Sequence, residues 1–202
     1  MIIGGRDPVD KRSIEDKIRA AKEFLTPNGL LKESASFPTP AILAAYKIDT
    51  NPTTPENSKR SHDAVAEMLA DVAFRVPAVY TALKYPGSAF LYDFQATNPF
   101  PGVPKSFRKA NHGINDLYVF NVAVDQIPTQ SLADWNTAAR QVQDMWVRFC
   151  YGEKPWGPFD PARKGPVFTF ADGAKGGEQE CVGSAVGEAT WQKWQAILDL
   201  AM

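Results

Sequence analysis

The sequence has few of the residues that form covalent cross-links, metal sites or strongly charged binding surfaces. Its 202 residues include two cysteines and two histidines, and 22 basic against 23 acidic residues give a net charge of −1. The cysteines show neither a metal-ligand spacing nor a redox motif. A near-neutral chain has no general field that would attract nucleic acid or an anionic membrane. We therefore expect no metal, no cofactor and no nucleic-acid partner.

Each cysteine has a structural interpretation and a chemical one. Cys150 could act as a nucleophile or form a disulfide with Cys181. Free cysteines usually behave as small apolar side chains, so we expect Cys150 to fill a small core position after Phe149 and Cys181 to lie in a buried strand.

Long apolar runs and targeting signals are also missing. No run is long enough to cross a bilayer, and the first residues lack the basic-then-apolar layout of a signal peptide. We expect no membrane span and a cytoplasmic location, with the alternative that a secretory signal was lost with an N-terminal part.

The composition and the apolar patterns predict an α/β protein with few strands. The 44% hydrophobic and 22% charged contents are typical of globular domains. Five helices follow from caps and apolar stripes, the third bending near Ala73 because Pro77 interrupts it. Short apolar runs predict four strands, and the polar segment 47–63 is expected to be an exposed connection. The predicted helices are 13–25, 39–46, 63–84, 131–152 and 188–202, and the predicted strands are 1–5, 88–95, 166–172 and 180–186.

His112 is the residue whose position most resembles a prepared catalytic site. It ends a loop rich in proline and glycine that follows the strand at 88–95, and a short helix begins near Ile114. Loops at the C-terminal ends of strands form the usual active-site edge of an open α/β sheet, where a histidine can act as a general base. The alternative is a surface histidine or a helix cap. Without a carboxylate partner it should titrate near ~6.5, whereas engagement of an acid such as Asp7, Asp10 or Asp116 would displace that value.

The stretch "NHGINDLYVFN" (111–121), followed by "WVRFCYGEKPWGPFDP" (146–161), resembles the C-terminal part of type-B carboxylesterases. That family has the α/β-hydrolase fold and includes the cholinesterases. Its matching pattern is a His-Gly pair, an acidic or amide residue and a Tyr-Val-Phe run, then a Trp-x-x-Phe helix and a Gly turn. The upstream segment "MLADVAFRVPA" (68–78) resembles the family's Asp-x-x-Phe-x-x-Pro segment.

The resemblance implies that His112 occupies the position of the catalytic base. In this fold the triad follows the chain order Ser, then Asp or Glu, then His, with the serine in a Gly-x-Ser-x-Gly elbow. The serines that follow a glycine, Ser88 and Ser184, lack glycines at both −2 and +2, so the chain contains no elbow. The nucleophile is therefore absent from these 202 residues.

The acid of the triad is the second departure from the family pattern. The first residues resemble the strand that precedes the catalytic Glu, ending at Ile3-Gly4. The aligned acid position then falls at or near Val9, between Asp7 and Asp10. Either aspartate could substitute, and the adjacent proline and basic residues favour solvated turn positions for both.

Two functional hypotheses follow. The first is the C-terminal segment of a carboxylic ester hydrolase, inactive alone and acting on a small-molecule ester when an N-terminal part completes it. The second is a non-catalytic hydrolase-like module that binds a small ester or a protein. We expect residues 1–202 to form a single partial α/β-hydrolase domain, whose first strands lie outside the chain. Its exposed sheet edge would allow self-association.

Overall fold

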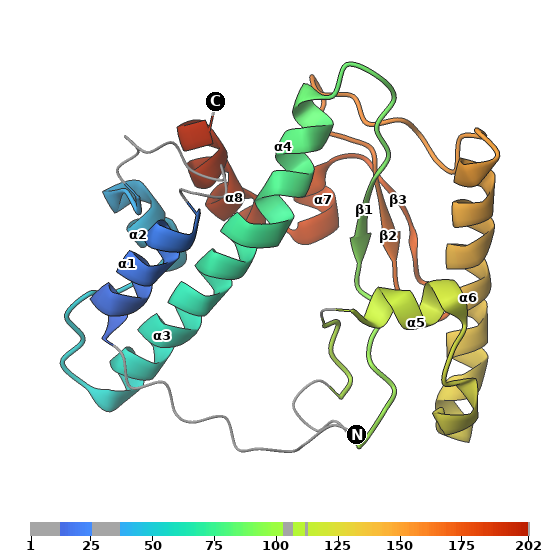
Figure 1. Ribbon diagram of the computed structural model, residues 1–202, viewed down its shortest axis with the longest axis horizontal. Coiled ribbons are helices and arrows are strands. Elements are labelled where there is room, and N and C mark those ends of the chain that lie inside the picture. Colours follow the sequence, from blue (N-terminus) through green and yellow to red (C-terminus); the bar gives the residue numbers. More distant parts are fainter. Residues whose placement is uncertain (1–12, 26–36, 103–106, 112, 202) are drawn as a thin grey trace. The chain divides into compact units, whose positions relative to one another are not determined.

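The computed structural model describes residues 13–25, 37–102, 107–111 and 113–201. The chain divides into two compact units, Met1–Ala78 with Gln192–Met202, and Val79–Trp191. The described residues form several helices and a three-stranded mixed sheet, which confirms the predicted α/β class with few strands (Figure 1). The strand predicted at 1–5 lies outside the described residues.

The first two helices begin where their capping residues predict. In α1 (Ile14–Leu25), the hydroxyl of Ser13 accepts a hydrogen bond from the Asp16 N–H at 3.0 Å. In α2 (Pro40–Tyr46), Thr39 Oγ1 accepts from the Ile42 N–H at 3.2 Å. Each hydroxyl satisfies one of the N–H groups that a helix N-terminus leaves without a partner.

The expectation of an exposed connection over 47–63 is wrong in its second half. Helix α3 (Pro55–Ala70) begins eight residues before its predicted start at position 63. Thr54 Oγ1 accepts from the Asn57 N–H at 3.2 Å, and Pro55 occupies the first helical position. The polar composition suggested a loop, but the capping chemistry at the segment's centre determines the conformation.

The predicted irregularity before Pro77 is a π-helical turn. Residues Asp71–Arg75 form this turn (η1) between α3 and α4 (Val76–Lys84). A proline cannot donate to the carbonyl four residues earlier, and a wider turn accommodates the missing hydrogen bond. Asp71 at the start of η1 is completely buried.

The sheet has the order β1-β2-β3. Strands β1 (Leu91–Phe94) and β2 (Val167–Phe170) are parallel, with Leu91 opposite Val167, and β3 (Gly177–Gln179) is antiparallel to β2. Among the described strands β1 is therefore an edge, paired with β2 alone.

The strand expected at 180–186 is wrong. Residues Val182–Val186 form the short helix α7, and the third strand lies in the preceding Gly-rich segment. At Gly176 a Cβ atom would lie 2.4 Å from the Thr169 carbonyl oxygen, so glycine permits this close approach to β2. Backbone pairing rather than an apolar pattern defines β3.

The core of the second unit lies between the sheet and two helices, α5 (Ile114–Phe120) and α6 (Thr129–Cys150), which Figure 1 shows beside the sheet. Phe168 and Phe170 extend from one face of β2 into this core. The apolar stripe predicted for α6 consists of Leu132, Trp135, Ala139, Val142, Trp146 and Phe149. Its middle residues are buried, and Trp146 and Phe149 in the last turns are exposed. The buried residues of α6 are Trp135, Ala138, Ala139 and Val142.

Both structural expectations for the cysteines need correction. Cys150 is exposed at the end of α6, and Cys181 is half-buried at the N-terminus of α7 rather than in a strand. Both thiols are free, so the alternative of a disulfide between them is also wrong.

The last helix is α8 (Glu188–Ala201), for which the apolar pattern predicts a stripe of Trp191, Trp194, Leu198 and Ala201. Trp194 and Leu198 are buried, and Trp191 is half-buried. Across the described part of the chain, every helix is too short or too polar to span a membrane.

Candidate functional site

The C-terminal ends of the parallel strands β1 and β2 carry the predicted active-site loop. Beyond the last residue of β1, the Gln95 N–H donates to the Phe170 carbonyl at 2.7 Å, which extends the pairing by one position. The first segment then continues into the histidine loop, and the second continues to Asp172. This is the edge at which open α/β sheets place their ligands.

A carboxylate holds the start of the histidine loop. Asp172 accepts two hydrogen bonds from Thr97, one from its N–H at 2.7 Å and one from its hydroxyl at 2.8 Å. Two bonds to one charged acceptor fix both the position and the orientation of the loop residue. The end of β2 is thereby joined to the loop that leaves β1.

Asn98 organises the next part of the loop. Its side chain is 4% exposed, and its Oδ1 accepts from the Phe100 N–H at 2.8 Å. Its backbone exchanges hydrogen bonds with the far side of the loop, donating to the Lys109 carbonyl at 3.1 Å and accepting from the Arg108 N–H at 2.8 Å. The two sides of the loop are thus joined two residues before Asn111.

The short helix α5 follows directly. Gly113 has φ +79, a left-handed conformation that glycine adopts without strain, and it turns the chain into α5. The Ile114 N–H donates to the Asn111 carbonyl at 3.2 Å. The Tyr118 hydroxyl donates a hydrogen bond to the carbonyl of Thr97, at the start of the loop, at 3.1 Å. Residues on both sides of position 112 are therefore anchored to the strand ends.

The predicted catalytic residues themselves lie outside the described residues. This holds for His112 and for both aspartates proposed as the acid, Asp7 and Asp10. The described neighbours of His112 are Asn111, which is exposed, and Gly113. The roles assigned to His112, Asp7 and Asp10 stay predictions.

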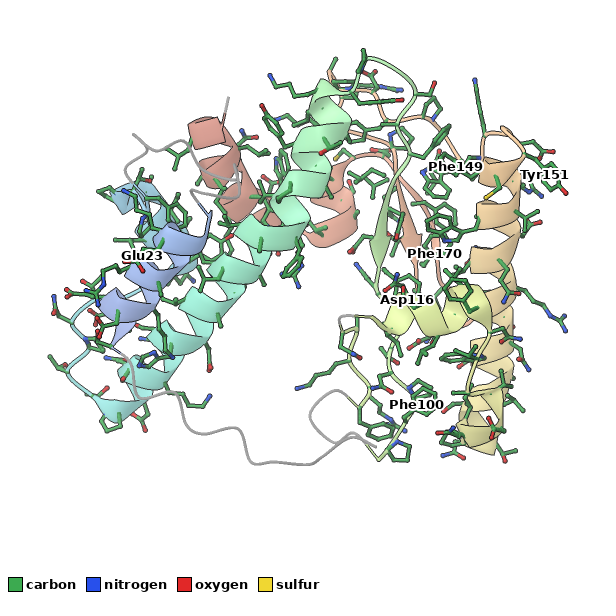
Figure 2. The ribbon with its side chains drawn as sticks, in the orientation of Figure 1. Glu23, Phe100, Asp116, Phe149, Tyr151 and Phe170 are labelled. Atoms are coloured by element: carbon green, nitrogen blue, oxygen red, sulfur yellow. The ribbon has the colours of Figure 1, made fainter. Side chains whose placement is uncertain are left out.

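Asp116, the local candidate for orienting the imidazole, lies exposed in the first turn of α5 (Figure 2). One of its oxygens accepts from the Asn115 side-chain amide at 2.9 Å. An exposed carboxylate with one amide partner keeps lone pairs for a further donor.

Asp172 is the acid at this edge that sequence reasoning missed. The sequence signal for it was its place as the last residue of the strand predicted over 166–172, directly before Gly173. Both of its oxygens already accept bonds from Thr97. The geometry therefore assigns Asp172 the role of holding the loop.

The two serines considered as nucleophiles lie elsewhere in the same unit. Ser88 is exposed and precedes the first residue of β1, at the strand end opposite the histidine loop. Ser184 is exposed on α7, and its Oγ lies 3.4 Å from the Cys181 sulfur. Among the described residues no group of three or more His, Cys, Asp or Glu side chains is arranged to hold a metal ion.

Tyr118 makes the stability of this edge sensitive to alkaline pH. Burial, with a smaller effect of the nearby Asp172 and Asp134 carboxylates, raises the pKa of its phenol. Because folding disfavours the phenolate, the unfolded chain loses this proton first, above about pH 10. The contribution of Tyr118 to stability is complete below that pH and decreases as the pH rises above it.

We expect the urea concentration at the unfolding midpoint to decrease as the pH is raised from about 9 to about 11. The decrease should be less steep in Tyr118→Phe. That variant should also lose about 1 kcal/mol at neutral pH with its hydrogen bond to Thr97. Tyr151→Phe is the control, because Tyr151 is 82% exposed. Equal alkaline slopes in the parent chain and Tyr118→Phe would contradict the assignment.

Comparison with known proteins gives one family match. Residues 8–175, most of the chain, match the sequence model of the Carboxylesterase family. The matched range includes the histidine loop, α5 and α6. No curated protein and no solved structure matches the chain.

Proposed function

Because the chain belongs to the carboxylesterase family, we propose that it is the C-terminal, histidine-bearing segment of a type-B serine carboxylesterase. The observation that carries the proposal is the family match across the His-Gly motif. The anchored loop gives it physical support, because hydrogen bonds hold the chain on both sides of position 112. Both units would then belong to one partial α/β-hydrolase domain.

The proposed reaction is the hydrolysis of a small carboxylic ester through an acyl-enzyme. A serine oxygen attacks the carbonyl carbon while His112 accepts the serine proton, which it then donates to the departing alcohol. Water attacks the acyl-enzyme in the same way, and the acid is released. Asp7 or Asp10 would orient His112, since the aligned acid position is Val9.

The 202 residues alone should not complete this reaction. No Gly-x-Ser-x-Gly elbow occurs in the sequence, so the nucleophile and the oxyanion donor beside it would have to come from another polypeptide segment. Losing a single oxyanion donor already costs about 10²–10³ in kcat. Without the serine, a general base has no group to activate.

A p-nitrophenyl ester assay tests this proposal. We expect the purified chain and His112→Ala to hydrolyse the ester at the same rate, close to that of buffer with an unrelated protein. A rate well above this background that His112→Ala abolishes would mean that the chain contains an unrecognised nucleophile.

The second candidate is a non-catalytic hydrolase-like module that binds a small ester or a protein. The observation that favours it is Val9 at the aligned acid position. The genomic sequence upstream of this chain distinguishes the esterase segment from the binding module. An open frame encoding a Gly-x-Ser-x-Gly elbow supports the esterase segment, whereas its absence supports the binding module.

Location and self-association complete the proposal. We also propose a cytoplasmic location, and the alternative is secretion through a signal carried by an N-terminal part. The outer edge of β1 is a surface at which a second copy could add a strand.

A further inference from the structure

An aromatic pocket lies in the second unit, on the face of the sheet that carries α6. It is about 70 Å³ in volume, and five aromatic side chains together with Met145 and Pro155 line it. We propose that this pocket binds a neutral molecule with a single aromatic ring. The site is separate from the proposed esterase function and does not depend on it.

The five aromatic rings form a closed circuit of edge-to-face contacts. The ring centroids are 6.0 to 6.5 Å apart, and the planes cross at 75° to 85°. A guest ring among them would lie within the ~4.5–7 Å range in which aromatic pairs attract one another. In order around the circuit the residues are Phe90, Phe149, Trp146, Tyr92 and Trp156.

Regular structure and core packing hold the walls in place. One wall is β1 with the residue before it, and another is the last turns of α6, where Phe149 lies on the side toward the sheet (Figure 2). Trp156 forms the third wall and also packs on Phe168, with ring centroids 5.2 Å apart. A preformed pocket loses little entropy when it binds a guest.

The charges around the pocket favour a neutral guest. No ionisable acid or base lines it apart from the phenol of Tyr92. The adjacent Arg148 is already paired with Asp144, its Nε lying 2.9 Å from the carboxylate. A charged guest would lose its hydration in the pocket without gaining an ionic partner, which is costly. A neutral ring has no charge to desolvate and avoids this cost.

The size and the opening of the pocket limit the guest to one ring. Its volume is about half that of the ~150 Å³ cavity that holds benzene in an apolar protein core. Trp146 and Phe149 at its mouth are 39% and 50% exposed, so part of the guest remains in solvent. Benzyl alcohol, with a single ring and a neutral polar group that can face the solvent, fits these limits.

The tryptophans provide an internal test on the full chain. Two of the five tryptophans, Trp146 and Trp156, line the pocket, while Trp135, Trp191 and Trp194 do not. In an NMR titration with benzyl alcohol, we expect saturable shifts of the indole N–H signals of Trp146 and Trp156 alone. Equal shifts of all five signals, or none, would overturn the proposal.

Variants and a charged analogue sharpen the test. Phe149→Ala should weaken binding at least about fivefold, because it removes one ring from the circuit. Phe120→Ala is the matched control, since Phe120 is 71% exposed and lies outside the pocket.

Benzylammonium should bind more weakly than benzyl alcohol, and tighter binding would overturn the neutral assignment. Concentration-dependent shifts of Trp146 and Trp156 without ligand would show that a second copy occupies the pocket, which would also overturn the proposal.

Discussion

Replacing Asp71 by alanine is expected to lower the free energy of unfolding by about 3 kcal/mol. The Asp71 carboxylate is completely buried, and it accepts the Tyr46 hydroxyl at 2.8 Å and Arg75 Nη1 at 2.6 Å. Tyr46 is itself 3% exposed, so its hydroxyl would lose its acceptor away from water. Arg75 is exposed and can be rehydrated.

Asp63→Ala is the matched control. Asp63 lies on α3, eight positions before Asp71, and pairs with Lys59 at 2.8 Å on the surface. Exposed pairs of this kind contribute about 0–1 kcal/mol. Asp71→Asn keeps one acceptor oxygen, so its loss in the free energy of unfolding should lie between those of Asp63→Ala and Asp71→Ala. Urea denaturation measures all three, and equal losses for Asp63→Ala and Asp71→Ala would contradict the structural role.

Trp135→Ala is expected to cost about 3–5 kcal/mol. Trp135 is 2% exposed, and its ring stacks on Tyr118 with centroids 3.8 Å apart. Its Nε1–H also donates to the Asn121 side chain at 3.3 Å. The substitution removes a large buried ring and leaves a cavity where α6 meets α5, the helix that follows the histidine loop.

The control for Trp135→Ala is Phe120→Ala at the end of the neighbouring short helix α5. Surface substitutions usually change stability by less than ~0.5 kcal/mol, and Phe120 is 71% exposed. Urea midpoints with near-ultraviolet circular dichroism follow both variants. A loss below about 1 kcal/mol in Trp135→Ala would mean that the aromatic stack contributes little to the core.

Local chemistry made some of the helix boundaries predictable. The Thr39-Pro40 pair at the start of the predicted helix 39–46 is a cap followed by a proline at the first helical position, and α2 begins there. The Thr54-Pro55 pair has the same chemistry, but its polar surroundings suggested a loop and the start of α3 was missed. Capping residues were the better guide because they act on the helix terminus directly.

Features that depend on long-range contacts were less predictable. β3 contains Gly177 and polar residues, and its partner in the sheet determines its conformation. The link between Asp172 and Thr97 joins residues 75 positions apart, which no local pattern indicates. Burial along α6 also differs from the stripe, because Trp146 and Phe149 line an open pocket rather than the closed core.

We propose that this carboxylesterase-family chain carries the histidine of the triad without the serine that it would activate. A fluorophosphonate probe tests this most directly, since it forms a covalent adduct with an activated serine, and intact-mass spectrometry detects the added phosphonyl group. We predict no adduct on the native chain under conditions that fully label an active serine esterase. A single adduct on one serine of this chain, lost in His112→Ala, would contradict the account.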